Sequence, residues 1–308
     1  MNTAKILITG ATGDTGGYAI EQLLHKGHEI RALVHRIDDR SKRLEDWGVE
    51  VVAGDYLDLG AMRAAVKGAR RAYFVYPIHP GIIQATAYFA QAAREAGVET
   101  IVNMSQISAR EDAKNPSARD HWVAERVFDW SGVAVTHLRP TFFAEWLLYA
   151  TPSIKAGTLS WPLGTGRHAP VAAEDQARVI VGILENPAPH RGKVYPLFGP
   201  KEYTPAEIAQ VVARLLGKDV RYKQVAVEEW SGRPFAPGQV STRTMYGELE
   251  KLQRGELKES FVRQHVREVA VDHQAGVFAG TNDLIETIGG RPPMSLEAFI
   301  EKHRQAFE

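Results

Sequence analysis

The chain has 308 residues, of which 44% are hydrophobic and 24% are charged, and it contains no cysteine. This composition excludes a disordered chain, a disulfide-stapled scaffold, thiol catalysis, thiolate-bound zinc and iron–sulfur clusters. The 37 basic residues balance the 37 acidic residues, so we expect no nucleic-acid partner. No apolar run approaches the roughly 20 residues of a membrane span. The N-terminal sequence does not resemble a signal peptide, and we expect a cytoplasmic protein without a membrane partner.

The first half of the chain alternates short β-branched runs with amphipathic segments of helical period. The runs lack polar alternation, which is typical of strands covered on both faces. We predict strands at Lys5–Thr9, Glu29–Val34, Val49–Ala53, Arg71–Tyr76, Thr100–Met104 and Ala134–Arg139. We predict helices at Thr15–Lys26, Arg40–Trp47, Leu59–Val66, Ile82–Ala96 and Ala118–Trp130. This alternation predicts right-handed βαβ units and an α/β fold with a doubly wound, Rossmann-like parallel sheet.

The second half of the chain has a different texture, with an aromatic run after Pro140 and a stretch punctuated by glycine and proline after it. The later elements that we predict are a helix at Glu174–Asn186, strands at Lys193–Leu197 and Arg221–Val227, and helices that begin at Thr204 and Ser295. We therefore expect residues 1–145, joined by 172–198, to form a dinucleotide-binding domain. Residues 146–171 and 199–308 are expected to form a smaller α+β substrate domain.

A glycine-rich loop joins the first predicted strand to the first predicted helix. One glycine permits a tight turn, the next lets the backbone approach a pyrophosphate, and the third permits close packing of helix and strand. The N–H groups at the helix start then face the phosphates. A glycine triplet can also be a plain connecting turn, but its place in a βαβ series favours a dinucleotide site. The predicted contacts in the loop are Gly10, Thr12, Gly13, Asp14, Thr15 and Gly16.

The end of the second strand predicts which dinucleotide is preferred. An NAD site usually has an acidic residue there for the ribose 2′-hydroxyl, whereas this chain has His35 and Arg36. Arg36, with Arg40, Lys42 or Arg43 nearby, can pair with a 2′-phosphate, so we predict NADP(H) over NAD(H). The alternative is a solvated basic turn, because two aspartates, at 38 and 39, lie in the same loop.

Several motifs together resemble an atypical short-chain dehydrogenase/reductase, and most closely the NmrA-like family of NAD(P)-binding proteins. They are the sequence GATGDTGG, the pair Gly54-Asp55, Leu138-Arg139-Pro140-Thr141, Gly199-Pro200 with the helix start after it, and Gly290-Arg291-Pro292-Pro293. This resemblance covers most of the chain. It implies a Rossmann-like fold, and a function as either a quinone or dye reductase or a redox-sensing regulator.

The resemblance also implies positions around the cofactor. Asp55 and Tyr56 would lie beside the adenine, and Tyr76 and Pro77 would border the ribose. For Tyr76 the alternative is a place in the hydrophobic core.

Further positions implied by the resemblance follow the fifth and sixth strands. Ser105 and Gln106 occupy the place where relatives keep a catalytic serine, although Ser105 could merely satisfy the end of a strand. Pro140, Thr141 and Phe142 would lie by the nicotinamide, and Phe142 could equally be core packing.

The chain departs from most short-chain dehydrogenases at the proton donor. None of its ten tyrosines is followed by lysine four residues later, so the usual Tyr-x-x-x-Lys pair is missing. At the expected place the chain has His121 and Glu125, one helical turn apart. In one interpretation His121 handles a proton at neutral pH while Glu125 holds its ring. In the other, both residues are an ordinary polar face that lines a pocket.

The missing pair shapes the predicted reaction. A simple alkoxide needs a strong proton partner, so alcohol oxidation is not expected. We predict an NADPH-dependent reductase that transfers hydride to a small aromatic, quinone-like, imine or conjugated acceptor, whose reduced form is already stabilised. We expect the acceptor pocket at the carboxyl ends of the strands, lined by Tyr76, Gln106, His121, Phe142, Trp146, Trp161 and Phe235.

The alternative function is a non-catalytic NADP(H) sensor that acts through a protein partner. The lost Tyr/Lys pair favours the sensor, and the aromatic pocket with its histidine favours the enzyme. We expect no catalytic metal, because the eleven histidines form no zinc-binding motif. The substrate, the direction of reaction and the oligomeric state are not determined by the sequence.

Overall fold

The computed structural model describes residues 5–231, 255–256 and 261–308. Its centre is a seven-stranded parallel sheet of order β3-β2-β1-β4-β5-β6-β8. The strands are β1 (Ile6–Ile8), β2 (Ile30–Val34), β3 (Glu50–Ala53), β4 (Arg71–Phe74), β5 (Thr100–Met104), β6 (Ala134–Pro140) and β8 (Val194–Leu197). The chain begins at a central strand and winds outward in both directions, so the predicted doubly wound sheet is confirmed.

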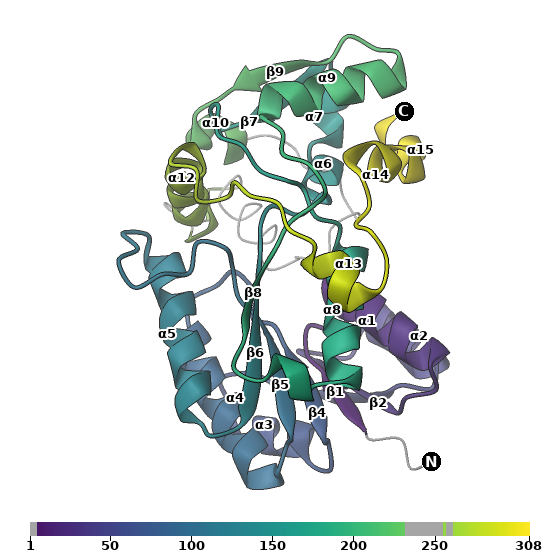
Figure 1. The fold of residues 1–308 in the computed structure, drawn as a ribbon, viewed down its shortest axis with the longest axis vertical. Coiled ribbons are helices and arrows are strands. Elements are labelled where there is room, and N and C mark those ends of the chain that lie inside the picture. Colours follow the sequence, from purple (N-terminus) through teal and green to yellow (C-terminus); the bar gives the residue numbers. More distant parts are fainter. Residues whose placement is uncertain (1–4, 232–254, 257–260) are drawn as a thin grey trace.

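Helices cover both faces of this sheet. The helices are α1 (Asp14–His25), α2 (Asp39–Asp46), α3 (Leu59–Val66), α4 (Ile82–Ala96), α5 (Pro116–Trp130) and α8 (Ala173–Glu185). On one face α1 packs against α8, and on the other α4 packs between α3 and α5. We call the sheet with these helices the lower lobe, after its place in Figure 1.

Most of the remaining elements form what we call the upper lobe, around a separate hydrophobic cluster (Figure 1). They are α6 (Trp146–Tyr149), α7 (Thr151–Lys155), β7 (Thr158–Trp161), α9 (Pro205–Leu216), β9 (Arg221–Gln224), α10 (Val227–Ser231), α12 (Phe261–Gln274), α14 (Leu296–Lys302) and α15 (Arg304–Phe307). β7 and β9 pair in parallel as a small second sheet. Two further elements, the 3-10 turn η1 (Ala188–His190) and α13 (Leu284–Gly289), accompany the lower lobe, where α13 packs on α8. The division into two domains remains a prediction.

The element boundaries follow capping chemistry. The Asn115 side chain accepts a hydrogen bond from the Ala118 N–H, so α5 begins at Pro116, two residues before its predicted start. The predicted strand at Arg221–Val227 is shorter, because β9 ends at Gln224 and α10 begins at Val227. The predicted last helix is divided into α14 and α15 at His303. The sequence analysis did not predict α12 or α13.

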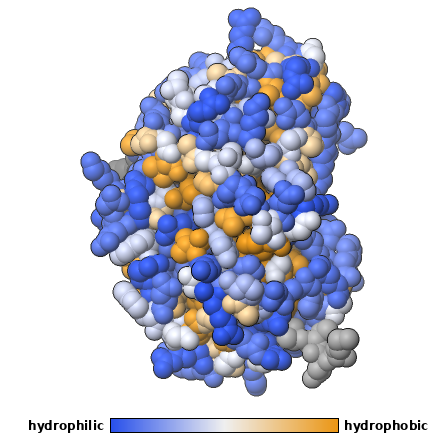
Figure 2. All heavy atoms as spheres, viewed as in Figure 1, coloured by the Kyte–Doolittle hydropathy of each residue, from blue (hydrophilic) through white to orange (hydrophobic). Residues whose placement is uncertain are grey.

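The carboxyl ends of the sheet strands point toward the upper lobe, and the chain passes from β6 directly into α6 (Figure 1). On the face drawn in Figure 2, hydrophobic residues gather in a band across the middle, where the two lobes meet, while hydrophilic residues dominate both ends. Parallel sheets bind ligands outside the carboxyl ends of their strands. The boundary between the lobes is therefore the place to look for a site. Among the described residues, no helix is long and apolar enough to cross a membrane.

Candidate functional site

The glycine loop between β1 and α1 has the geometry of a phosphate cradle. Gly10 has a φ of +57°, and a Cβ there would overlap the side chain of Val75. A Cβ on Gly16 would overlap the Gly10 carbonyl group, so helix and loop meet backbone to backbone. Gly13 is the N-cap of α1 and supplies no capping side chain. The first N–H groups of the helix are thus left for a ligand.

Buried hydroxyl groups hold this loop in place by hydrogen bonds. The Tyr56 hydroxyl accepts a hydrogen bond from the Gly10 N–H and donates one to the Val75 carbonyl, each at 3.1 Å. Burial raises the pKa of Tyr56. The Thr15 side chain is also turned inward, 2.8 Å from the hydroxyl of Tyr73. The hydroxyls of Tyr56 and Thr15 therefore shape the loop from within, and the contact of Tyr56 with adenine stays a prediction. Thr12 and Asp14 are half-buried at the mouth of the loop.

The basic turn after β2 contains both a bound and an exposed arginine. Arg40 is held by Asp38, with Nη2 2.8 Å from Oδ2, and Asp38 also caps α2 through the N–H groups of Arg40 and Ser41. The Arg40 hydrogen bond lowers the pKa of Asp38. His35 and Arg36 are exposed, and within the described residues neither has an ion pair. Asp38 thus caps α2 and binds Arg40, whereas Arg36 is available to bind a ligand.

Two exposed apolar side chains follow β2 and β3, and the sequence analysis missed both. Ile37 is 49% exposed and Leu57 is 40% exposed, on loops that follow neighbouring strands. Between them in the chain, Asp55 accepts a hydrogen bond from the Leu57 N–H at 2.9 Å. Apolar surface at the ligand-binding end of a parallel sheet suits a flat ring such as adenine.

Tyr76 and Pro77 follow β4 at the same end of the sheet. Tyr76 is 8% exposed, packs edge-on against Tyr56, and donates a hydrogen bond to the Pro80 carbonyl at 3.0 Å. Pro77 is exposed. Tyr76 therefore belongs to the hydrophobic core, as the alternative interpretation held, and its contact with the ribose stays a prediction.

The segment after β5 holds buried polar atoms that lack partners. Among the described residues, the hydroxyls of Ser105 and Ser108 and the Nδ2 of Asn115 are buried without a hydrogen bond. The Ser105 side chain therefore does not satisfy a strand end. Within the described part of the chain, the Gln106 side chain has one hydrogen bond, to the hydroxyl of Ser117 at 3.5 Å. Buried polar groups are normally paired, so these atoms mark a place that a ligand could complete.

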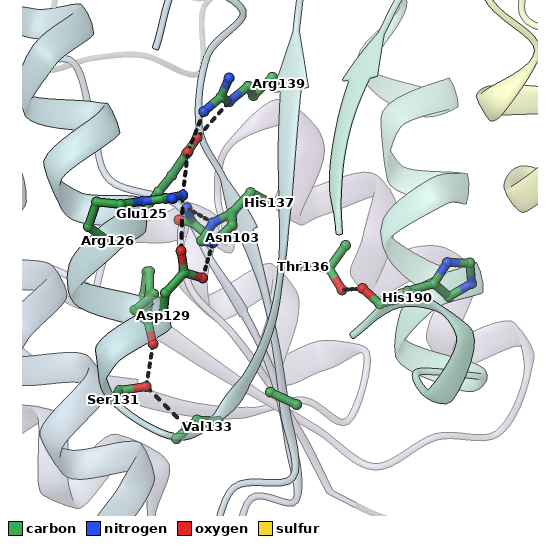
Figure 3. A network of polar contacts seen from close by, with 12 residues as sticks. Asn103, Glu125, Arg126, Asp129, Ser131, Val133, Thr136, His137, Arg139 and His190 are labelled. Carbon is green, nitrogen blue, oxygen red and sulfur yellow. Dashed lines mark hydrogen bonds and ion pairs between the residues drawn. The ribbon is translucent and has the colours of Figure 1, made fainter. Parts of the chain in front are cut away.

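His121 lies one turn above Glu125 on α5, but the structure does not join the two side chains. Both carboxylate oxygens of Glu125 bind the guanidinium of Arg139, at 2.8 and 2.5 Å (Figure 3). No hydrogen bond reaches His121 from any described residue. The first of the two interpretations, in which Glu125 holds the ring of His121, is therefore wrong, because a charged guanidinium competes better for a buried carboxylate than a neutral imidazole does.

The protonation state of His121 also differs from the expected one. Burial, reinforced by the nearby His265, lowers the pKa of His121 to about 3. The ring is therefore neutral at neutral pH, rather than titrating near pH 6.5. It can donate one hydrogen bond and accept another, but it cannot serve as a cationic acid. Its contact with a substrate stays a prediction.

The Glu125–Arg139 pair continues into a polar network between α5 and the sheet (Figure 3). Arg126 binds Asp129 at 2.9 Å, and Asp129 binds His137, whose other ring nitrogen lies 3.0 Å from Asn103. Glu125 has no exposed side-chain surface and Arg139 is 22% exposed. The network thus fixes α5 against β5 and β6 directly below His121.

The end of β6 is joined to the segment that follows α12. The Thr141 hydroxyl donates a hydrogen bond to the Phe278 carbonyl at 2.9 Å. The Phe142 ring, 6% exposed, lies 4.7 Å from that of Phe278 and 4.8 Å from that of His168. Phe142 therefore packs in the core, as the alternative interpretation held. Its nicotinamide contact, and those of Pro140 and Thr141, stay predictions.

The other predicted pocket residues differ in their burial. Trp161 is buried in the hydrophobic cluster of the upper lobe. Trp146 is half-buried and stacks on Trp230, with ring centres 6.4 Å apart. Phe235 lies outside the described residues.

A buried pair of histidines lies behind Phe142. His168 Nδ1 is 2.9 Å from His273 Nε2, and His273 Nδ1 is 2.9 Å from the Leu163 carbonyl. A carbonyl only accepts, so His273 carries its proton on Nδ1 and receives a hydrogen bond from His168. Burial lowers the pKa of both rings. Among the described residues, no group of three histidines and carboxylates could hold a metal ion.

The comparisons with known proteins agree with this geometry. Residues 2–269 match the NmrA-like family. The NAD(P)H azoreductase of Xenophilus azovorans is 29% identical over 306 residues, which cover 98% of this chain and 99% of that protein.

Two solved structures share the fold. The NADPH-dependent quinone oxidoreductase of Escherichia coli, complexed with NADPH, has a TM-score of 0.80, 23% identity and coverage of 97% and 99% of the two chains. The Citrobacter sp. triphenylmethane reductase, complexed with NADP(H), has a TM-score of 0.78, 24% identity and coverage of 98% and 99%.

Proposed function

This chain belongs to the NmrA-like family, and we propose that it is an NADPH-dependent reductase of small aromatic, quinone-like, imine or conjugated acceptors. Its NAD(P)H azoreductase relative supports the general role of an oxidoreductase that uses a nicotinamide cofactor. The observation that carries the acceptor class is the neutral His121 at the place of the missing Tyr/Lys pair. Without a strong acid at that position, the acceptor has to stabilise its own reduced form.

The residues present fit a dinucleotide. Gly10 and Gly16 leave no room for a Cβ, and α1 starts without a side-chain cap. The pyrophosphate would lie against the N–H groups of the first turn of α1. The adenine would lie between Ile37 and Leu57, the two exposed apolar side chains at the ends of β2 and β3.

We expect Arg36→Ala to weaken NADPH binding by about tenfold or more, because an exposed arginine that binds the 2′-phosphate contributes a charge-assisted hydrogen bond. NADH, which lacks that phosphate, should bind the variant as it binds the parent. The measurement is the dissociation constant of each nucleotide by fluorescence titration. Arg94→Ala, an exposed arginine in the last turn of α4, is the control and should bind both nucleotides as the parent does. An equal loss for NADPH and NADH would contradict a 2′-phosphate contact.

When bound, the nicotinamide would supply a hydride. A neutral acceptor such as a quinone also takes one proton from water, whereas a cationic dye or iminium ion is reduced by the hydride alone. The protein orients the acceptor. The neutral ring of His121 holds a polar atom of the acceptor by a hydrogen bond, without changing its own charge. The half-buried Trp146, stacked on the buried Trp230, would offer a flat apolar surface to an aromatic acceptor.

The test is NADPH consumption, followed by absorbance, with quinones, triarylmethane dyes, azo dyes, iminium salts and enones. We expect turnover with at least one class and a roughly tenfold lower kcat/KM in His121→Ala, as for one lost hydrogen bond. Because the pKa of His121 is about 3, its charge state should not change between pH 5.5 and 8. We therefore expect no inflection from this ring in the kcat/KM profile over that range. Tight NADPH binding without turnover of any acceptor would favour the sensor, and efficient oxidation of a plain secondary alcohol would contradict the proposed acceptor class.

A further inference from the structure

Helix α12 of the upper lobe is fastened to the segment that follows β5 in the lower lobe. Arg110 binds Asp272 of α12 with two nitrogens, at 2.7 and 3.2 Å, and also donates to the Ser108 carbonyl at 3.0 Å. Asp272 is buried. His265 lies seven residues, or about two turns, before Asp272, so the two side chains share a face of the helix. That face is therefore directed toward the lower lobe.

His265 is a buried imidazole with an unused ring nitrogen. It is 6% exposed, and its Nδ1 has no hydrogen bond to any described residue. Its charge would act on His121 of α5, which also lacks a hydrogen bond within the described part of the chain. Burial lowers the pKa of His265 to about 4, and that of His121 to about 3. One uncharged imidazole from each lobe thus faces the boundary between the lobes, near enough for the charge of His265 to act on His121, and neither has a hydrogen bond to the described residues.

Further buried polar atoms without partners lie near this boundary between the lobes. The hydroxyls of Ser105 and Ser108, on the segment that Arg110 fastens to α12, have no hydrogen bond among the described residues. A buried polar group that lacks a partner is unfavourable, because it has given up its hydrogen bonds to water. Unpaired polar groups on the segment after β5 and on α12, which Arg110 joins, indicate a ligand that supplies the missing partners.

We propose that His265 is a substrate-contacting residue, which together with His121 binds the polar atom of the acceptor, such as a quinone oxygen. This proposal rests on the proposed reductase function. A neutral imidazole has one N–H donor and one bare nitrogen. The pair can therefore donate to a quinone oxygen before reduction and accept from the hydroquinone hydroxyl afterwards. The quinone gains a hydride and a proton from water, and neither ring gains or loses a proton overall.

The first test compares His265→Phe, which removes the hydrogen bonds, with His265→Gln, which keeps a donor and an acceptor. We expect His265→Phe to lower acceptor kcat/KM about tenfold, mainly through KM, while the NADPH dissociation constant and Tm stay close to those of the parent. His265→Gln should retain more activity. The control is His303→Phe, at the α14–α15 junction, where the ring packs on Phe299; it should behave as the parent.

The double variant His121→Phe/His265→Phe should lose less activity than the product of the two single losses, because both rings serve one atom. Equal activity of the Phe and Gln variants at position 265, or a parallel loss of NADPH binding, would indicate a merely structural role and overturn the proposal.

A second measurement separates this proposal from the proposed function. 2-Methyl-1,4-naphthoquinone is titrated into the complex with NADP⁺, and the Cε1–H resonances of the histidines are followed by NMR. Joint shifts of the His121 and His265 resonances, with weaker binding by His265→Phe, support the subsite even if no acceptor is turned over. A quinone that shifts neither resonance, whether it binds elsewhere or not at all, overturns the subsite.

Discussion

Gly16→Ala should abolish cofactor binding, whereas Gly17→Ala, one residue further along α1, should leave it unchanged. A Cβ on Gly16 would overlap the Gly10 carbonyl oxygen and lie 2.9 Å from its carbon and 3.2 Å from the Ala11 Cα. These are backbone atoms of the phosphate cradle, so the loop itself would have to move. A Cβ on Gly17 has its nearest neighbour, the Ala11 carbonyl oxygen, at 3.8 Å, which is ordinary contact.

The measurement is NADPH binding by fluorescence titration, with thermal unfolding of the same samples. We expect the dissociation constant of Gly16→Ala to rise at least about a hundredfold, because the N–H groups of the cradle lose their alignment with the pyrophosphate. Gly17→Ala should keep the parent's affinity. Its Tm should be equal or higher, since alanine is favoured over glycine within a helix by about 1 kcal/mol. Parent-like NADPH affinity in Gly16→Ala would show that the loop is not the cofactor site.

The lower lobe could be predicted from the sequence because its signals are local. Each strand is a short run of apolar residues between turn glycines. The doubly wound parallel sheet then follows from the alternation of strands and helices and from the place of the glycine loop after the first strand, whereas the strand order was not predicted. The differences lie at the ends, where caps decide. Asn115 starts α5 two residues before the apolar pattern suggests.

Helix α12 could not be predicted because it has polar residues on its buried face. His265, Asp272 and His273 are all buried there, so the hydrophobic period that normally reveals a helix is interrupted. Their burial is stabilised by partners far away in the sequence, such as Arg110 for Asp272 and His168 for His273. No local pattern contains that information. The same residues therefore escaped both the element prediction and the list of candidate site residues.

In the candidate site, the position of the cofactor loop could be predicted from its glycine motif. The hydrogen-bond partners of the side chains could not. The hydroxyls of Tyr56, Thr15 and Thr141 each bond to the protein itself. The spacing of His121 and Glu125 places them on one face of α5, yet it cannot tell which neighbour the carboxylate will bind. That choice is made by Arg139, which β6 brings beside α5.

We expect Glu125→Leu to lower the free energy of unfolding by about 3 kcal/mol, the lower end of the range for breaking a buried ion pair. The loss arises because Arg139, only 22% exposed, would keep its charge without its carboxylate partner. Arg139→Met should be similarly destabilising, since it leaves the fully buried Glu125 carboxylate with Arg126 alone, at 3.5 Å. The double variant Glu125→Leu/Arg139→Met should lie within about 1 kcal/mol of the parent, because apolar pairs of similar volume often replace buried ion pairs without loss.

The measurement is a double-mutant cycle by urea unfolding, with the surface pair Arg63–Glu95 as the matched control. That pair has the same two-bond geometry, at 2.7 and 2.8 Å, and joins α3 to α4, but both side chains are largely exposed. Its removal should change stability little, since exposed pairs are screened by water. Additive losses for Glu125 and Arg139 would contradict the coupling.

A stable double variant would also allow His121 to be tested without the Glu125–Arg139 pair, whose carboxylate lies one helical turn further along α5. If the ion pair only supports the fold, acceptor KM should be unchanged in that variant, whereas a raised KM would mean that the pair positions His121.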